Sequence, residues 1–151
     1  MNGKYLVLGL VGSAVFAGGL MYYLQVYAFY ERLPDTTPLH VATETGQQPL
    51  SLTHFDGIDA TSSPLRFRAC AQLADTTELS SAILATNPDP LTAPGWFSCF
   101  DAPSIGLALQ RGEAKAYLSV HDITRGIDRI IAVDADGRAY AWHQLNGTLE
   151  N

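Results

Sequence analysis

The chain has 151 residues, a length expected for one domain, and 47% of them are apolar whereas only 16% are charged. Soluble proteins usually carry a charged share of about 25%, so this composition excludes a disordered chain, a nucleic-acid-binding tail and a coiled coil. The net charge of −6 argues against DNA, RNA or anionic lipid headgroups as binding partners. These averages combine two regions of very different composition.

Residues 5–30 contain no charged side chain, and Lys4 is the single charged side chain before them. A membrane-spanning helix needs about 20 apolar residues, a length that residues 5–24 already reach. The run exceeds the apolar core of about 7–15 residues that is typical of a cleaved signal peptide. We therefore predict an uncleaved transmembrane anchor in residues 1–30.

Aromatic residues gather at the end of this run, as they do where a membrane helix reaches the membrane–water interface. The predicted interfacial belt consists of Tyr22, Tyr23, Tyr27 and Tyr30. Three of these residues, Tyr23, Tyr27 and Tyr30, have the spacing of a single helical face. The alternative to an ordinary belt is a specific stack of rings around a ligand.

Small residues recur at every fourth position of the predicted helix, at Gly9, Ser13 and Ala17. Such a stripe lets a second helix approach closely, and a single-span protein has no other helix of its own to use it. The alternative is that glycine and alanine are simply common in membrane helices. We expect the lipid bilayer and an integral membrane protein complex as partners of this helix, and no nucleic acid.

The positive charges of the amino terminus and Lys4 favour a cytoplasmic N-terminus by the positive-inside rule. The rest of the chain would then lie in the periplasm, beyond a bacterial inner membrane. We expect a polar linker at residues 31–37, an exported domain at 38–146 and a short tail at 147–151. All 15 acidic residues and eight of the nine Lys and Arg residues follow residue 30, so this part has a net charge of −7.

The exported domain is expected to have an α+β fold, with an antiparallel sheet and two short helices. Residues 38–43 and 49–54 flank a turn-rich gap and predict a hairpin. Residues 64–71 alternate between apolar and polar positions, which predicts a half-buried strand with Arg68 on its polar side. The segment HFDGID (54–59) is predicted to be a turn.

Two helices follow in this prediction. Asp75 and Glu78 are spaced like an N-cap residue and its reciprocal partner, which predicts a short helix ending near Leu84. After a proline-rich loop, Asp101 caps a second helix that has Pro103 in its first turn and Gly112 near its end.

The last third of the chain is predicted to be β-structure. Residues 115–122, 129–133 and 138–145 alternate or are continuously apolar, as strands are. The sequence DADG at residues 134–137 is a strong signal for a tight turn between the last two of them.

Cys70 and Cys99 are the two cysteines of the chain. In an oxidising compartment two cysteines in a small domain usually form a disulfide. Reduced buried cysteines, or a metal or redox pair, are the alternatives, although the C-x-x-C spacing of a thioredoxin-type site is missing. We predict a structural disulfide.

The four histidines are His40, His54, His121 and His143. None has the spacing of a helical metal-binding pair, and we interpret them as surface or half-buried strand residues, with His121 and His143 facing each other on adjacent strands. A copper site that joins Cys99 to a histidine stays an alternative, because thiolate and imidazole suit copper. The carboxylates at 54–59 and 134–137 lack the closing Glu of a calcium loop, so we expect no metal or cofactor.

No G-x-S-x-G elbow, phosphate-binding loop or G-x-G-x-x-G motif occurs in a suitable place, so we expect no catalytic residues and a protein that is not an enzyme. The segment at 93–103 places Trp96, Phe97 and Phe100 around a cysteine. If these rings are exposed they form a protein-contact site. If they are buried they pack over the disulfide and the sheet, which is the arrangement we favour.

The segments MNGK…MYYLQVYAFYE, SSPLRFRAC, LTAPGWFSCFDA and GRAYAWHQLN together resemble a family of small alphaproteobacterial membrane proteins of unknown function. The resemblance covers nearly the whole chain and implies one N-terminal span and one exported domain. It implies no catalytic residues. Some members carry a histidine kinase label, but this chain is too short to hold the ATP-binding domain of a kinase.

GWFSCF is also similar to copper-delivery proteins of haem–copper oxidase assembly, which have a second cysteine in that motif where this chain has only Cys99. We expect a non-catalytic accessory subunit or assembly factor of an inner-membrane, respiratory complex. Its acidic domain would also attract a basic soluble electron carrier. The alternatives are a periplasmic metal or redox protein that uses Cys70 and Cys99, and an envelope sensor or regulator with a ligand pocket.

Overall fold

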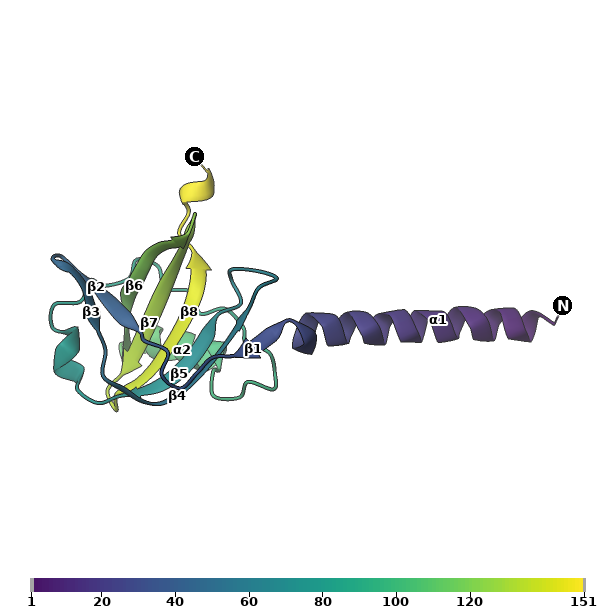
Figure 1. Cartoon of the computed structure of the whole chain (residues 1–151), viewed down its shortest axis with the longest axis horizontal. Coiled ribbons are helices and arrows are strands. Elements are labelled where there is room, and N and C mark those ends of the chain that lie inside the picture. The colour runs from purple at the N-terminus through teal and green to yellow at the C-terminus, as the bar shows by residue number, and fades with distance from the viewer. Residues whose placement is uncertain (1, 151) are drawn as a thin grey trace. The chain divides into compact units, whose positions relative to one another are not determined.

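The computed structural model describes residues 2–150 and falls into two compact units, with the boundary after Tyr30. Met1 and Asn151, the outermost residues of the expected anchor and tail, lie outside the described residues. The first unit is an apolar helix, and the second is built around an antiparallel sheet with one short α-helix (Figure 1). The predicted α+β class is confirmed.

The helical unit consists of α1 (Gly3–Tyr23) and a π-helical turn, η1 (Leu24–Ala28), and neither contains a buried residue. Its 26 residues rise about 39 Å, which exceeds the hydrocarbon core of about 30 Å. By length and composition this helix can cross a membrane. A signal sequence near an N-terminus passes the same test, so the two are not distinguished by it.

The π-helical turn decides how the terminal tyrosines meet. The rings of Tyr23 and Tyr27 stack with their centroids 6.2 Å apart, and Tyr22 contacts Tyr27 edge-on at the same distance. Tyr30 does not share this helical face, because the helix ends at Ala28 and Tyr30 lies in strand β1 (Tyr30–Arg32). The wider π turn and the early helix end therefore limit the predicted face to two tyrosines.

The second unit contains a six-stranded sheet in the order β1-β4-β5-β8-β7-β6, in which the pairs from β4 to β6 are antiparallel. The further strands of this sheet are β4 (Leu52–Ala60), β5 (Arg68–Leu73), β6 (Ala114–Thr124), β7 (Ile127–Asp134) and β8 (Arg138–Leu145). A separate antiparallel hairpin is formed by β2 (His40–Thr43) and β3 (Gly46–Pro49).

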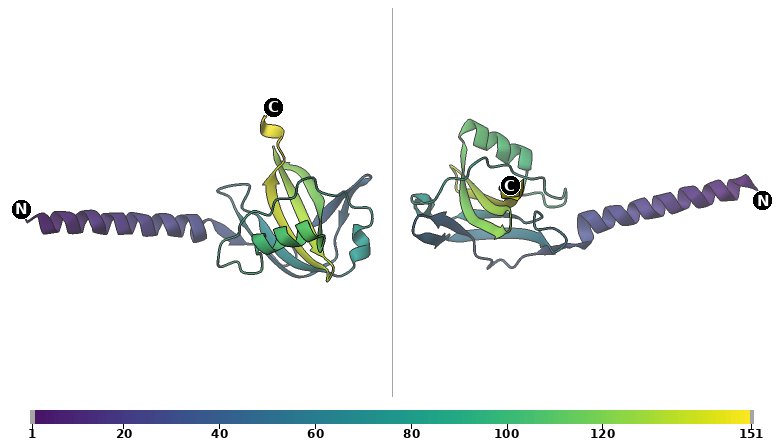
Figure 2. Two further views of the ribbon diagram at one scale, coloured as in Figure 1. Left: turned by 180° about the vertical axis from the view of Figure 1, so that it is seen from behind. Right: turned by 90° about the horizontal axis from the view of Figure 1, so that it is seen from above.

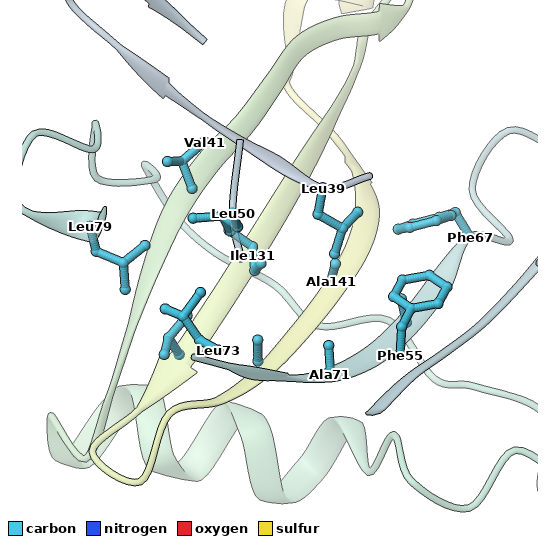
Figure 3. Packing of buried hydrophobic residues seen from close by; sticks show 13 residues of the cluster. Leu39, Val41, Leu50, Phe55, Phe67, Ala71, Leu73, Leu79, Ile131 and Ala141 are labelled. Atoms are coloured by element: carbon cyan, nitrogen blue, oxygen red, sulfur yellow. The ribbon is translucent and has the colours of Figure 1, made fainter. Parts of the chain in front are cut away.

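The sheet is covered on both faces. One face packs against the β2–β3 hairpin, and the side chains between them form the main hydrophobic core (Figure 3). This core contains Leu39, Val41, Leu50, Phe55, Phe67, Ala69, Ala71, Leu73, Leu79, Ile131, Val133, Ala139 and Ala141. Helix α2 (Ala102–Arg111) lies across the opposite face, behind the strands in Figure 1 and in front of them in the left view of Figure 2.

Strand β8 shows the two-sided packing residue by residue, since successive side chains of a strand point to opposite faces. Ala139 and Ala141 belong to the main core, whereas the rings of Tyr140 and Trp142 lie 6.3 and 6.2 Å from the ring of Phe100 on the other face. Trp142 is fully buried. The central strands are therefore apolar on both sides.

Helix α2 has the ends that the sequence predicts. One carboxylate oxygen of Asp101 accepts the Ser104 amide at 3.3 Å, and the other accepts the Ser104 hydroxyl at 2.8 Å. Pro103 lies in the first turn, where no amide hydrogen is needed. Gly112 ends the helix in the left-handed conformation, with φ of 72°.

The prediction of a helix from Asp75 to near Leu84 is wrong. A 3-10 turn, η2 (Thr76–Leu79), takes its place. Asp75 caps the turn by accepting the Thr77 amide. The Glu78 carboxylate does not bond to the Asp75 amide as a reciprocal cap would, and instead accepts the amide and hydroxyl of Ser51. The chain then runs as single bridges beside β2 and β6 rather than as a helix, because these backbone partners satisfy its amides.

The predicted turn at HFDGID (54–59) is also wrong, because this segment lies inside β4. The pairing of β4 with β5 is irregular between Thr53 and Asp56, and His54 has a positive φ of 52°. The turn-like composition therefore marks a β-bulge. The hairpin near residue 45 is confirmed, but its second strand is β3 rather than residues 49–54, and the strand expected from residue 64 begins only at Arg68.

The expected polar linker at 31–37 is partly sheet structure. The Leu33 amide donates to the Gly57 carbonyl at 2.8 Å, and Arg32 forms an ion pair with Asp56 at 2.6 Å. The second unit therefore begins immediately after Tyr30.

The Asp101 cap can be tested by substitution. Asp101→Ala leaves the Ser104 amide without its side-chain acceptor, and we expect a loss of about 1 kcal/mol in the free energy of unfolding. Glu113→Ala removes the same charge beyond the other end of α2, where no cap is lost, and serves as the control. Equal denaturation midpoints for the two variants would contradict the assigned role of Asp101.

Candidate functional site

The two cysteines form the disulfide that the sequence predicts. The Cys70 and Cys99 sulfurs are bonded, with a Cα–Cα distance of 6.3 Å, and the bond joins β5 to the loop that precedes α2. Cys99 is exposed and Cys70 is half-buried. Both sulfurs are used in this bond, so neither is a thiolate ligand for a metal in this state.

The aromatic segment near Cys99 divides between the interior and the surface. Phe97 and Phe100 are 2% and 4% exposed, so they pack in the core and are not available for partner contact. Trp96 is half-buried, and the Arg32 guanidinium lies 5.8 Å from its ring centroid. Of the three proposed contact residues, Trp96 alone is partly exposed to solvent.

Arg68 was expected on the polar side of a half-buried strand, but it is only 4% exposed. Its guanidinium donates to four backbone carbonyls, at 2.9 Å to Leu91, 3.1 Å to Thr92, 2.8 Å to Leu65 and 2.6 Å to Phe67. A buried charge is tolerated when its hydrogen-bonding groups are satisfied, and the planar fork of arginine suits several acceptors at once. Arg68 therefore ties two loops to the start of β5.

His143 does not face His121, because β7 lies between the strands that carry them. It is 5% exposed and its ring stacks on Phe67, with centroids 4.6 Å apart. Its Nδ1 donates to the Pro64 carbonyl at 2.6 Å, and its Nε2 accepts from Arg129 Nε at 3.0 Å. These two partners define the neutral tautomer with the proton on Nδ1.

The environment of His143 suppresses its protonation. Burial lowers its pKa to about 4, and the positive charges of Arg129 and Arg68 act in the same direction, while the hydrogen bond to Pro64 opposes them. Burial also raises the pKa of Asp59 and lowers that of Arg129. The arrangement holds a neutral imidazole in place at neutral pH.

The tip of the β6–β7 hairpin carries a cluster that the sequence reasoning missed. His121 Nδ1 lies 2.9 Å from a carboxylate oxygen of Asp128, and His121 Nε2 lies 3.7 Å from one of Asp122. One ligand atom from each residue lies within 4.8 Å of the others, a spacing that suits a cation. The available signal was a His-Asp pair followed by a second aspartate beyond a glycine turn.

Hydrogen bonds within the protein already occupy this cluster. Asp122 Oδ1 accepts the Gly126 amide and the Asn146 side chain at 3.0 and 2.7 Å, and Asp128 Oδ1 accepts the Asp122 amide and the same Asn146 group at 2.9 and 2.8 Å. The Asn146 bond is the main cause of the lowered pKa of Asp122. The cluster thus stabilises the hairpin turn, and a cation would compete with these donors.

A hollow of about 500 Å³ adjoins the hairpin tip. Its apolar lining includes Leu118 and Ile130, and its polar lining includes His121, Asp128 and Gln144. Gln144 is itself fully engaged, since its oxygen accepts from Trp142 and from the Asp89 amide and its nitrogen donates to the Asn87 carbonyl. The lining of the hollow thus combines apolar side chains with an imidazole and a carboxylate.

The small-residue stripe of α1 is a free surface within this chain. Gly9, Ser13 and Ala17 are exposed, and a Cβ placed on Gly9 would meet no atom within 4 Å outside the helix's own backbone and its chain neighbours. The Ser13 hydroxyl donates to the Leu10 carbonyl at 2.9 Å, so its hydrogen-bonding need is met inside the helix. The stripe is open to a second helix at backbone distance.

These features define a protein with one apolar N-terminal helix and a small disulfide-bonded α+β domain. The chain belongs to DUF6446, a family of unknown function, whose sequence profile matches residues 37–151. No curated protein and no solved structure matches the chain. The resemblance to a family of unknown function is confirmed, and the match covers the folded domain.

The disulfide is expected to stabilise the domain by on the order of 3 kcal/mol, because it closes a loop across a separation of 29 residues. The double variant Cys70→Ser, Cys99→Ser should melt at a lower temperature, and wild-type protein treated with reductant should melt with it. The double variant itself should be unaffected by reductant. A wild-type melting temperature that reductant does not change would contradict a structural role for this bond.

The lowered pKa of His143 predicts a pH-dependent stability. Between pH 6.5 and pH 4, His143 binds a proton in the unfolded chain but stays neutral in the folded protein. The free energy of unfolding should therefore decrease as the pH falls through this window, by up to roughly 3 kcal/mol. His143→Gln keeps one donor and one acceptor without a titrating group, so its denaturation midpoint should lose this part of the pH dependence.

The matched control is His54→Asn, at an exposed histidine with a positive φ, which should keep the wild-type pH dependence. Identical pH profiles for wild type and His143→Gln would show that His143 is not the group responsible.

Proposed function

We propose that this protein is a non-catalytic accessory subunit or assembly factor of an inner-membrane, respiratory complex. The observation that carries the proposal is the apolar helix of residues 3–28, none of which is buried within the chain. So large an exposed apolar surface is stable only in lipid or against other membrane helices. The N-terminus lies in the cytoplasm and the domain in the periplasm.

Two independent features support this sidedness. Lys4 places positive charge before the helix, as the positive-inside rule requires of a cytoplasmic end. The Cys70–Cys99 disulfide lies after the helix, and disulfides persist in the oxidising periplasm rather than in the cytoplasm.

The stripe of Gly9, Ser13 and Ala17 is the proposed contact with a partner helix. Small side chains permit close approach of two backbones, which is how helices associate in lipid. The face roughly opposite, which includes Val11 and Val15, is bulkier and suits contact with lipid chains. The acidic domain, with a net charge of −7, would in addition attract a basic soluble electron carrier.

A non-catalytic role is supported by how the polar groups of the domain are used. His143, Arg68 and Asn146 each bond to other parts of the fold. The hollow beside the hairpin tip favours a second candidate, a regulator that binds a small ligand. A thermal-shift screen of the full chain against small metabolites separates this candidate from the first.

The test is affinity purification of the tagged full chain from native membranes, with mass spectrometry of the proteins recovered. We expect one complex at fixed stoichiometry. The triple variant Gly9→Leu, Ser13→Leu, Ala17→Leu should lose this complex but remain in the membrane, because bulky residues on the stripe prevent close approach.

The matched control is Val11→Leu, Val15→Leu, which changes the opposite face and should retain the complex. Recovery of the protein alone, or equal recovery from the stripe and control variants, would contradict the proposed role of the helix.

A further inference from the structure

After the apolar helix ends, the chain bonds to the sheet within a few residues, at Arg32 and Leu33. Arg32 forms its ion pair with Asp56 at 2.6 Å, and the next residue donates its amide to Gly57 at 2.8 Å. The Arg32 guanidinium also lies 5.8 Å from the ring centroid of Trp96. Trp96 is therefore fixed beside the residue at which the chain enters the domain, although it is distant in sequence.

The length of the connection limits how far Trp96 can lie from the end of the helix. Three residues separate Ala28, the last residue of η1, from Arg32. Even a fully extended chain spans at most about 14 Å between these two Cα atoms. The polar headgroup layer on each side of a bilayer is roughly 5–7 Å thick. A connection of this length keeps Arg32 within about 14 Å of the helix end, and so close to the membrane that holds the helix.

Two loops lie near this entry point. Residues 61–67 follow β4, whose Asp56 and Gly57 hold the entering chain, and residues 91–97 carry Trp96. Both loops lie at the end of the sheet where β1 joins it (Figures 1 and 2). The Arg68 guanidinium binds the carbonyls of Leu65 and Leu91 and so holds the two loops together. We refer to residues 61–67 and 91–97 as the loop end.

The loop end contains no acidic residue and combines apolar and aromatic side chains with exposed Thr61, Ser62 and Thr92 and half-buried Arg66. Pro64 is exposed, and Leu65, Leu91, Pro94 and Trp96 are half-buried. Tryptophan prefers the membrane–water interface, where its ring is in apolar surroundings and its N–H reaches water. The chain that enters here comes from the tyrosine-rich end of the helix, where Tyr22, Tyr23 and Tyr27 precede the connection.

We propose that the loop end rests on the surface of the bilayer that holds the helix, with the Trp96 ring in the headgroup layer. This inference rests on the membrane anchoring in the proposed function. The domain has a net charge of −7, so anionic headgroups do not attract it and the contact depends on the ring rather than on charge. The contact fixes the orientation of the domain on the membrane and leaves its far side open to a partner.

The experiment uses tryptophan fluorescence of the full chain reconstituted in phosphatidylcholine vesicles. The chain has two tryptophans, and Trp142 is fully buried, so a lipid-borne quencher can reach only Trp96. In vesicles whose acyl chains carry bromine near the headgroup, the emission of the wild type should fall relative to vesicles without bromine. Bromine placed deep in the acyl chains should cause a smaller loss, and added salt should not change either result.

Trp96→Phe is the matched control, because it leaves Trp142 as the single tryptophan, and its tryptophan emission should show no bromine-dependent loss. A melting temperature equal to that of the wild type establishes that this variant is folded. Wild-type emission that brominated lipid does not quench, in protein that floats with the vesicles, would overturn the contact of the loop end while leaving the anchor intact. Failure to float with the vesicles would instead overturn the membrane anchor, and this inference with it.

Discussion

The guanidinium of Arg68 joins parts of the chain that lie far apart in the sequence, and the loop end depends on it. It donates to the carbonyls of Leu65 and Phe67 on one side and to those of Leu91 and Thr92 on the other. Two residues further along the same strand, the disulfide holds the loop again at Cys99. The segment that carries Trp96 is therefore attached to β5 at both ends, and helix α2 begins directly after it. Because these carbonyls satisfy a buried charge, any conformation in which either loop moves away is penalised.

The same end of the domain receives the chain from the apolar helix. Arg32 and Leu33 are bonded to β4, so the chain joins the sheet of the second unit within three residues of the boundary after Tyr30. A short connection restricts how far a domain can lie from a membrane that its anchor spans. In the proposed accessory role this restriction is useful, because it limits the orientations in which a partner would meet the domain.

The polar groups of the described domain serve the fold. His143 is held neutral between Pro64 and Arg129, and the aspartates at the hairpin tip accept the Asn146 side chain and backbone amides. Groups that are satisfied in this way stabilise a particular structure more than they activate a substrate. This use of polar side chains agrees with the proposed role, in which the exposed helix makes the contact with a partner.

The features that the sequence by itself determined have signals within a few neighbouring residues. The uncharged run to Tyr30, the Asp134–Gly137 turn, and the ends of α2 at Asp101 and Gly112 are local, because they depend on hydropathy, turn chemistry and backbone freedom. The disulfide followed from there being two cysteines in the chain. Tertiary structure alone decided the burial of Arg68, the pairing of Glu78 with Ser51 in place of a helix, and the inclusion of the 54–59 segment in β4. Each of these depends on an acceptor, donor or strand edge that lies more than ten residues away along the chain, and no local pattern records where the fold will bring such a partner.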